Sequence, residues 1–409
     1  MKLKLSSALQ FRRQPSLEVY PARQTRLGTV AVGATRVHVS KLENQVTHDT
    51  LWLTSPLNGG GFSNFRLARG RRVFGVKELY LPDDGPLPQA PGTHPRHKRD
   101  TRVDEFKHER QMLELAHSEA RFERVWQDGN RLFCFMKYMR GDLYDAVTSP
   151  PWSKAAAGPL AIDALADVAI QLAYDHARGM IHGDIKLENV LWNERAHFVL
   201  TDFGGAHLVN ECVERPTYTP QYASPEKLGG EASGRPADVW ALGILALQIL
   251  CQHRHPLLIS RDAETAEAQS ASIKRKITAF SAWHCAYFGS PMASGRPVTR
   301  NRALDRFAGD LQSTYPKGLM DLVLKDMLNP DPKQRPSAAQ VAEAARRMRL
   351  SGKLHRIMRR SPTRQFLVQA AQSAKNRHLR DAVKALEDVA AHRLNPTDDP
   401  SRYDSEDEG

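Results

Sequence analysis

Cysteine is scarce in this chain, which has only four among its 409 residues, at positions 134, 212, 251 and 285. None of them belongs to a Cys-x-x-Cys pair, so the sequence predicts neither a disulfide framework nor a cysteine-bound zinc ion. No apolar run approaches the roughly 18 residues that a membrane-spanning helix needs. The N-terminus is basic but has no sustained apolar segment, so we expect no secretory signal peptide and a cytoplasmic location.

Internal repeats and a biased composition are also missing. Apolar residues make up 41% of the chain and charged residues 25%, which is close to the average of globular domains and argues against wholesale disorder. The net charge is +12, from 58 basic and 46 acidic residues. An excess of this size permits binding to nucleic acid, anionic lipid or an acidic protein, but it requires none of them.

The hydrophobic pattern predicts strands in the first part of the chain and helices afterwards, which favours two lobes. Proline, glycine and basic residues predict an exposed loop at 81–102. The other expected elements are strands within 30–39, at 122–126 and at 132–136, a helix from about 103 to 117, and a mainly helical region from about 155 to 350.

Three polar side chains stand at fixed spacing in the segment 181–189, which reads Ile-His-Gly-Asp-Ile-Lys-Leu-Glu-Asn. Asp184 has the chemistry to orient an attacking hydroxyl and accept its proton, Lys186 to neutralise a transferred phosphoryl group, and Asn189 to bind Mg²⁺. Asp202 follows an apolar strand at 198–200 and precedes a Phe-Gly pair, where a carboxylate can bind a metal that bridges two phosphates. The pattern indicates phosphoryl transfer.

Three further motifs follow: Thr-Pro-Gln-Tyr-Ala-Ser-Pro-Glu at 219–226, Asp-Val-Trp-Ala-Leu-Gly at 238–243 and Pro-Asp-Pro-Lys-Gln-Arg-Pro at 330–336. With the two motifs above, their order and spacing resemble the signature set of the protein kinase family. The resemblance covers about residues 51–350. It implies an α+β fold of two lobes, a small β-rich N-lobe with helix αC and a larger α-helical C-lobe.

The resemblance also implies ATP as the phosphoryl donor and Mg²⁺ as the cofactor, with Mn²⁺ as the alternative ion. It makes Asp184 and Lys186 catalytic, and it makes Asn189 and Asp202 the metal ligands. The residues of structural importance that it implies are His182, which packs with Phe203, the ion pair of Glu226 and Arg335, and Asp238, which braces the catalytic loop.

The nucleotide-binding residues implied by the resemblance lie in the N-lobe and the hinge. Lys77, in a strand similar to the family's Val-Ala-Ile-Lys strand, is the phosphate ligand, and Glu109 on αC is its partner. Glu105 and Glu114 are nearby, so a solvated helix charge is the alternative for Glu109. The other implied ATP-binding residues are Leu57, Asn58, Gly59, Gly60, Gly61, Phe62, Ser63, Phe65, Met136 as gatekeeper, Met139 in the hinge and Leu191 beneath the adenine.

Several positions depart from the family pattern. Gly183 stands where many members have an arginine that receives an activation-segment phosphate, so the loop is of the non-RD type. Asn58 and Ser63 replace two glycines of the glycine-rich loop. Phe65 and Gly75 replace the usual valine and alanine over the adenine, and their volumes can compensate. None of these changes removes a phosphate or metal ligand.

The residues leave three functional interpretations open. The favoured one is an active Ser/Thr protein kinase whose substrates are proteins with Ser or Thr acceptors. In its activation segment, Thr217 is a candidate for modification and Thr219 is expected beside Asp184 and Lys186. The second is a pseudokinase scaffold, to which the altered glycine-rich loop and Gly183 point. The third, a small-molecule kinase, normally lacks the segment that ends in Pro-Glu.

The segments before and after the kinase-like region differ from it in charge and composition. Residues 1–50 form a basic extension to which we assign no role, and residues 396–409 are acidic and predicted to be disordered. Residues 351–395 form a basic amphipathic helical extension that we expect to pack on the C-lobe. Contact with an acidic partner or anionic lipid is the alternative, and no DNA binding is expected. The non-RD loop and the basic N-terminus also resemble bacterial kinases that are delivered into host cells.

Overall fold

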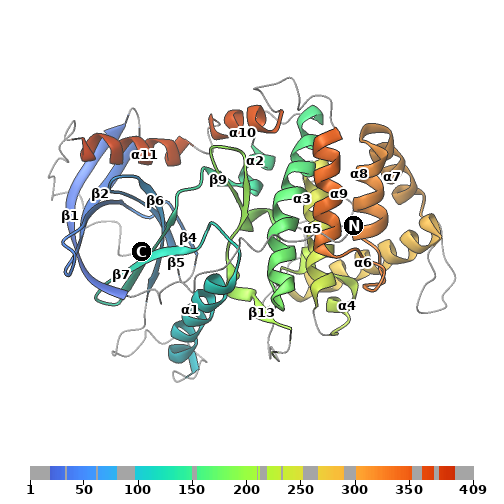
Figure 1. Ribbon diagram of the computed structural model, residues 1–409, viewed down its shortest axis with the longest axis horizontal. Coiled ribbons are helices and arrows are strands. Elements are labelled where there is room, and N and C mark those ends of the chain that lie inside the picture. The colour runs from blue at the N-terminus through green and yellow to red at the C-terminus, as the bar shows by residue number, and fades with distance from the viewer. Residues whose placement is uncertain are drawn as a thin grey trace, which may run out of the picture. The chain divides into compact units, whose positions relative to one another are not determined.

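The computed structural model describes residues 19–32, 35–60, 63–80, 97–149, 154–209, 211, 219–231, 234–251, 266–289, 301–351, 362–372 and 377–391 (Figure 1). Its chain divides into two compact units. Unit 1 consists of Met1–Glu105, Arg121–Tyr138 and His378–Gly409, and unit 2 of Phe106–Ala120 and Met139–Arg377.

Unit 1 is built from β-strands. The predicted strands at 122–126 and 132–136 are present as β7 and β8, joined by a turn in which Gly129 adopts a φ of 56°. The expected strand within 30–39 is instead the end of one strand and the start of another. The strands are β1 (Val19–Val32), β2 (Thr35–Asn44), β3 (Thr50–Thr54), β4 (Asn58–Gly60), β5 (Ser63–Arg69), β6 (Val73–Tyr80), β7 (Phe122–Asp128) and β8 (Arg131–Lys137).

The strands of unit 1 close on themselves. They hydrogen-bond in the order β3-β2-β1-β7-β8-β6-β5-β4, and β3 also pairs with β5, which joins the two ends of the sheet. The long strand β1 closes the ring because it pairs antiparallel with β2 and parallel with β7, where Val19 lies opposite Val125. Residues 19–44, which belong to the extension without an assigned role, therefore supply two strands of this barrel.

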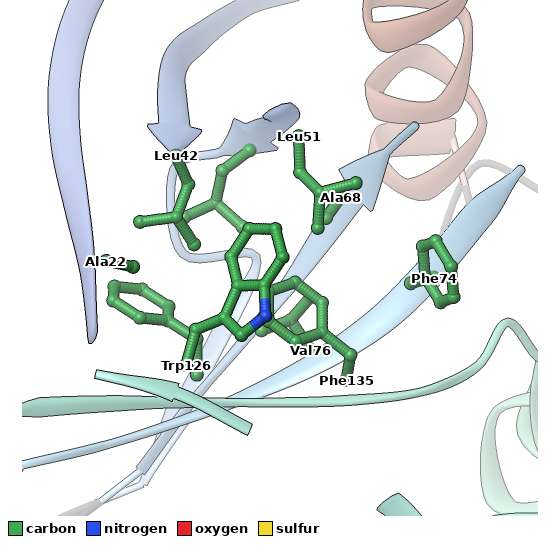
Figure 2. Packing of buried hydrophobic residues seen from close by; sticks show 10 residues of the cluster. Ala22, Leu42, Leu51, Ala68, Phe74, Val76, Trp126 and Phe135 are labelled. Carbon is green, nitrogen blue, oxygen red and sulfur yellow. The ribbon is translucent and has the colours of Figure 1, made fainter. Parts of the chain in front are cut away.

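The interior of the barrel is apolar. Strand β6 alternates, with Phe74 and Val76 facing inward, as expected for a strand with one buried face. Figure 2 shows the indole of Trp126 among the surrounding apolar side chains. The other buried members of this cluster are Ala22, Leu42, Leu51, Leu53, Ala68, Phe133 and Phe135.

A buried ion pair accompanies this core. Nε of Arg66 donates to the carboxylate of Glu78 at 2.6 Å, and its Nη1 donates to the carbonyl oxygen of Thr54 at 2.9 Å. The Glu78 side chain is fully buried, and the guanidinium of Arg66 is its ion-pair partner there. The same strand therefore places Glu78 on the inner face and the adjacent Lys77 on the outer face.

Helix α11 (Arg377–Ala390) packs on the outer face of the barrel, where Figure 1 shows it in red beside the blue strands. Its buried residues Ala382, Ala385, Leu386 and Val389 contact apolar side chains of β1, β2 and β5. Our expectation that the whole basic extension packs on the helical lobe is therefore wrong for α11. The amphipathic pattern predicts the helix and its apolar face, but it does not specify which surface that face covers.

Unit 2 is mainly helical. Its centre is the long helix α3, which packs against α5 and α9. Helix α10 also lies on α3, where Oγ1 of Thr363 donates to the buried Asp163 at 2.6 Å. The helices are α2 (Leu143–Thr148), α3 (Lys154–Ala177), α4 (Pro225–Leu228), α5 (Arg235–Leu250), α6 (Ala266–Phe288), α7 (Arg302–Thr314), α8 (Lys317–Met320), the π-helix η4 (Asp321–Met327), α9 (Ala338–Ser351) and α10 (Pro362–Gln372).

Short strands and single helical turns lie between the longer helices of unit 2. They are β9 (Gly141–Asp142), β10 (Met180–Ile181), η1 (Leu187–Asn189), β11 (Val190–Trp192), β12 (Phe198–Leu200), η2 (Phe203–Gly205), β13 (His207–Leu208) and η3 (Pro220–Tyr222). Helix α1 (His97–Leu115) covers most of the helix expected at 103–117. It begins inside the segment expected to be a loop, of which 81–96 lies outside the described residues.

One helix of the described chain is long and apolar enough to cross a membrane. It is the segment Ala155–Ala177 of α3, so the expectation that no apolar run approaches this length is wrong. In the structure, 72% of its apolar window is buried. The core helix of a globular protein meets the same length and composition criteria, so this is weak evidence for a membrane span.

Candidate active site

The segment 181–189 forms a loop between β10 and η1. Ile181, Ile185 and Leu187 are buried and fix its backbone in unit 2, while the polar residues alternate with them. The alternation turns Asp184 and Lys186 away from the core, toward one another. The apolar residues thus anchor the loop in the core, and the charged residues between them stay partly exposed.

Asp184 is the centre of a hydrogen-bond network. Its Oδ2 accepts from Nζ of Lys186 at 2.6 Å and from the amide nitrogen of Asn189 at 3.2 Å. Its Oδ1 accepts from the hydroxyl of Thr219 at 2.8 Å and from the backbone N–H of Thr219 at 3.0 Å. Nζ of Lys186 also donates to the Thr219 hydroxyl at 3.2 Å. Four predicted residues are therefore brought together, across 35 residues of chain.

This network sets the charge of Asp184. Burial alone would raise the pKa of its carboxyl, but the hydrogen bonds and the charge of Lys186, with the hydrogen bonds of Thr219, hold the pKa below its ordinary value. Asp184 is therefore ionised at neutral pH. An ionised carboxylate that already accepts a hydrogen bond from the Thr219 hydroxyl is equipped to orient another hydroxyl and to accept its proton.

Asp238, in the first turn of α5, accepts hydrogen bonds from the backbone of the loop. Its Oδ2 accepts from the N–H of His182 and its Oδ1 from the N–H of Gly183, both at 2.9 Å. Nε2 of His176 lies 2.8 Å from Oδ2. Burial opposes ionisation of Asp238, but the hydrogen bond and charge of His176 outweigh it and lower its pKa. Asp238 thus braces the backbone of the loop at His182 and Gly183.

His182 packs beside an aromatic ring, as the motif comparison implied. Its ring centroid lies 4.7 Å from that of Phe203, and both side chains are buried. Burial lowers the pKa of His182 despite three nearby carboxylates, so its ring is neutral at pH 7. The imidazole lies within hydrogen-bond distance of the Thr201 carbonyl oxygen, at 3.2 Å.

Asn189 and Asp202 lie at the same end of a two-stranded ladder. Strands β11 and β12 pair antiparallel with Val190 opposite Leu200, and the N–H of Thr201 donates to the carbonyl of Asn189 at 3.0 Å. The amide nitrogen of Asn189 donates to the carbonyl oxygen of Asp184 at 2.9 Å, which leaves Oδ1 as its acceptor for a metal. Asp202 adopts a left-handed φ of 61°. Two hard oxygen donors fit Mg²⁺, which is usually bound by few protein ligands and by phosphate oxygens.

The glycine at position 183 is required by the backbone. Its φ is +78°, and an ideal Cβ would lie only 2.7 Å from the carbonyl oxygen of Gly205. A side chain at this position would therefore strain the loop and displace the backbone of η2. A glycine at this position is consistent with the close approach of the two backbones.

In unit 1, the outer face of β5 and β6 carries the predicted nucleotide-binding residues. Phe65 lies opposite Lys77, and Gly75 lies opposite Met136. An added Cβ at Gly75 would meet the Phe65 ring and Cγ of Met136, each at 3.3 Å. The phenylalanine therefore occupies the space that the glycine leaves, which is the compensation in volume that we expected.

The glycine-rich segment forms a hairpin between β4 and β5. Asn58 lies opposite Phe65 and Gly60 opposite Ser63, and the N–H of Leu57 donates to the carbonyl of Phe65 at 2.8 Å. Gly61 and Phe62 lie outside the described residues, as does Thr217 of the activation segment. Gly59 is in β4.

The remaining predicted residues fall into unit 2. Met139 is buried and packs in one small cluster with Val199, against which Leu191 also packs. Glu109 lies on α1 and is buried, which disfavours the alternative of a solvated helix charge. Glu105 on the same helix is exposed.

Glu226 and Arg335 form a bidentate ion pair. Nη1 and Nη2 of Arg335 donate to the two carboxylate oxygens of Glu226 at 2.6 and 2.8 Å. The guanidinium also donates to the carbonyl of Asn329 at 2.7 Å and lies 5.0 Å from the ring centroid of Trp240. Burial acts against the charge of Glu226, but Arg335 lowers its pKa. The pair joins the end of the activation segment to the segment before α9.

Comparison with known proteins decides the family. A family model described as the protein kinase domain matches residues 93–345, which is more than half of the chain. The chain belongs to the protein kinase family. The predicted family and the predicted α+β fold of a β-rich and a helical lobe are thereby confirmed. The matched range begins after the glycine-rich hairpin and Lys77.

Curated relatives of this kinase match over shorter stretches. The human ribosomal protein S6 kinase-related protein is 36% identical over 141 residues, which are 34% of this chain and 33% of the relative. The cAMP-dependent protein kinase type 3 of Saccharomyces cerevisiae is 30% identical over 152 residues, 36% of this chain and 37% of the relative. The CaM kinase-like vesicle-associated protein of Danio rerio is 35% identical over 111 residues, 26% of this chain and 25% of the relative. The matches thus span between a quarter and somewhat over a third of these relatives.

Two side chains of the kinase's helical unit were not anticipated. Nε2 of His108, next to Glu109 on α1, lies 2.6 Å from the carbonyl oxygen of Ala206, just after the Asp-Phe-Gly motif at 202–204. Nζ of Lys227 donates to the carbonyl oxygen of Gly183 at 3.0 Å. The sequence carried no signal for either contact, because histidine and lysine at helix positions are ordinarily solvated.

The kinase has a buried carboxyl group at Asp175, next to the histidine that contacts Asp238. Asp175 on α3 is 1% exposed, and its Oδ1 accepts from the backbone N–H of His117 at 2.9 Å. Burial raises its pKa to about 6, while that hydrogen bond and the neighbouring His176 act in the opposite direction. The folded protein therefore binds this proton more tightly than the unfolded chain does, and its free energy of unfolding falls as the pH rises from about 4 to about 6.

We expect Asp175→Asn to stabilise the protein by about 1–3 kcal/mol at pH 7.5, since a difference of about 2 pKa units corresponds to about 3 kcal/mol. The asparagine keeps the acceptor for His117 and removes the buried charge. Urea unfolding between pH 4.5 and 8, with exposed Asp310→Asn as the control, measures the effect. A variant as stable as the wild type at pH 7.5, with the same pH slope, would contradict it.

Proposed function

We propose that this chain is an active Ser/Thr protein kinase of the non-RD type, which transfers the γ-phosphoryl group of Mg-ATP to hydroxyl groups of proteins. The observation that carries the proposal is the network at Asp184, in which one ionised carboxylate accepts from Lys186 and from a threonine hydroxyl. A hydroxyl in the place of the Thr219 hydroxyl would be oriented for attack in the same way.

Each residue of the network has a chemical task in this proposal. Asp184 orients the acceptor hydroxyl and takes its proton, and the ammonium of Lys186 offsets the negative charge on the transferred phosphoryl group. Lys77 binds the nucleotide phosphates. Asn189 and Asp202 would hold the Mg²⁺, or Mn²⁺ in its place, whose charge stabilises the phosphates as the bond to the leaving oxygen breaks.

The proposal is tested by incubating the purified protein with Mg²⁺ and ATP labelled in the γ position, and following label into a protein acceptor. We expect Lys77→Met and Asp202→Ala each to lower the rate by about 10²-fold or more, because each removes a charge that stabilises the transferring group. Both variants are expected to fold, since neither side chain is part of the buried core. Circular dichroism and thermal unfolding check this.

The alternative is a pseudokinase that serves as a binding scaffold. It is favoured by Asn58 and Ser63 in the glycine-rich hairpin, and by a family match that begins only at residue 93. A wild-type rate within threefold of both variants would refute the kinase proposal and support the scaffold. Nucleotide binding, measured on the same proteins, separates a scaffold that binds ATP from one that does not.

The activation segment provides a second test. We expect Thr219→Ala to lower the rate by about tenfold or more, because it removes a hydroxyl that holds Asp184 and Lys186 in place. Thr217→Ala and phosphatase treatment are expected to leave the rate within about threefold, since position 183 offers no arginine to a phosphate. A strong loss after phosphatase treatment that Thr217→Ala reproduces would show that a phosphate at Thr217 is required.

For the substrates and the cellular location, we propose only a general class. A protein with a Ser or Thr acceptor is the substrate class that follows from the family, and a cytoplasmic site of action stays a hypothesis from the sequence. Delivery into a host cell, and contact of the basic C-terminal segment with an acidic partner or anionic lipid, stay hypotheses from the sequence. Phosphoproteomics with active and Asp184→Asn protein would identify substrates.

A further inference from the structure

Lys227 places a buried ammonium group beside the catalytic loop. The residue lies in α4 and is 9% exposed, and its Nζ donates to the carbonyl oxygen of Gly183 at 3.0 Å. The N–H of the same glycine donates to Asp238 of α5 at 2.9 Å. Both polar groups of the Gly183 backbone are therefore held by side chains from other elements, one by a cation and one by an anion.

The carbonyl that Lys227 holds belongs to the peptide bond between Gly183 and Asp184. Rotation of this peptide would turn the Asp184 carboxylate away from Lys186 and Thr219. A glycine at φ +78° resists such rotation less than other residues do, because it has no Cβ. A larger residue at position 183 could not restrict this rotation instead, because its Cβ would lie too close to the carbonyl oxygen of Gly205. The orientation of this peptide is therefore set by contacts from outside the loop.

The surroundings of Lys227 suit this task. Burial lowers the pKa of its ammonium group, whereas the carboxylates of Asp238, Asp184 and Glu226 favour the charged form. The backbone from which it extends is fixed, since the preceding residue Glu226 is bound at both oxygens by Arg335. A long, flexible side chain is thus anchored at its base and at its tip.

We infer that Lys227 is a positioning residue for the proposed phosphoryl transfer, which clamps the Gly183–Asp184 peptide to the end of the activation segment. The clamp supplies from α4 the link between segment and loop that other members make with a phosphate and an arginine at position 183. The inference rests on the proposed function for its effect on rate, but the clamp itself is a structural contact that can be measured without catalysis.

The kinetic test compares Lys227→Met, Lys227→Arg and, as a control, Lys333→Met, whose lysine is exposed. We expect Lys227→Met to lower kcat by about 10- to 100-fold, the scale of a misplaced catalytic group, and to leave KM for ATP within about threefold. Lys227→Arg, which keeps a cationic donor, is expected to recover kcat to within about fivefold of the wild type. The control is expected to match the wild type in both.

A second readout does not depend on activity. Amide hydrogen exchange of the peptide that contains residues 183–187 is expected to be about tenfold faster in Lys227→Met than in the wild type, with exchange in α9 unchanged. If Lys227→Met fails to fold, Lys227→Gln replaces it, since its neutral amide keeps a donor but not the charge. A fivefold or greater loss of kcat in Lys227→Gln would support the clamp, and wild-type kcat would overturn it.

The outcomes separate this inference from the proposed function. A wild-type rate no higher than that of Asp184→Asn would refute the kinase activity, and hydrogen exchange would still decide whether the clamp exists. An active wild type with unchanged kcat and unchanged exchange in Lys227→Met would overturn the clamp alone. Reduced thermal stability with an unchanged kcat for each folded molecule would make Lys227 merely structural, and would also overturn it.

Discussion

Replacing Asp184 by asparagine is expected to lower turnover about 10³-fold, within the 10²- to 10⁴-fold range typical of a lost general base. The change keeps the shape of the side chain, and its oxygen can still accept from Lys186 or Thr219. It removes the negative charge and with it the ability to take up a proton. Because the carboxylate is proposed to contact the acceptor hydroxyl and not the nucleotide, the affinity for ATP is expected to change less than threefold.

Rate and nucleotide affinity must be measured on the same preparation to test this. Turnover comes from label transfer, and affinity from calorimetric titration with ATP and Mg²⁺. Exposed Asp310→Asn, which makes the same chemical change away from the site, is the control. A large loss of ATP binding with little loss of turnover would show that Asp184 has a different role.

The hydrogen-bonded cluster at Asp184 was predictable because its signals are local. Asp184, Lys186 and Asn189 lie within six residues, and their spacing alone places two of them on one side of the loop with apolar anchors between. Thr219 is 35 residues away, and only the family resemblance placed it beside Asp184. The hydrogen bonds found between these residues follow the spacing closely.

The barrel of unit 1 was not predictable, because its closure depends on pairing between distant strands. Strand β1 alternates weakly, and it pairs in parallel with β7, more than a hundred residues later. A two-residue period indicates a strand but not its neighbour. The same holds for α11, whose apolar face is evident from its sequence, whereas the surface that it covers is set by the apolar side chains that β1, β2 and β5 leave on the outside.

Lys227 and Asp175 were missed for a related physical reason. Charged side chains are exposed in most proteins, so a lysine or aspartate in a helix is expected to be solvated. Burial of either depends on groups from other elements, which are Gly183 and Asp238 for Lys227 and the backbone of His117 for Asp175. Such contacts become visible only when the tertiary structure brings the elements together.

The buried pair of Glu226 and Arg335 gives the largest expected effect on stability. Arg335→Met is expected to lower the free energy of unfolding by about 3–5 kcal/mol, because it leaves the carboxylate of Glu226, whose side chain is only 9% exposed, without its partner. It also deprives the carbonyl oxygens of Asn329 and Pro236 of a donor. Chemical unfolding at pH 7.5 measures the loss, and Arg347→Met is the control, since Arg347 pairs with Glu343 at an exposed position and should change stability by less than about 0.5 kcal/mol.

The pH dependence of the same variant distinguishes a lost ion pair from lost packing. Arg335 holds the pKa of Glu226 below its ordinary value, so the pair stabilises the folded state above that value and loses its effect as the pH falls through the lowered pKa. The difference in unfolding free energy between wild type and Arg335→Met is therefore expected to shrink as the pH is lowered below about 4.5. A difference that stays constant from pH 7.5 to pH 3.5 would show that the guanidinium acts by packing on Trp240 and by hydrogen bonds to the backbone, and not through the charge of Glu226.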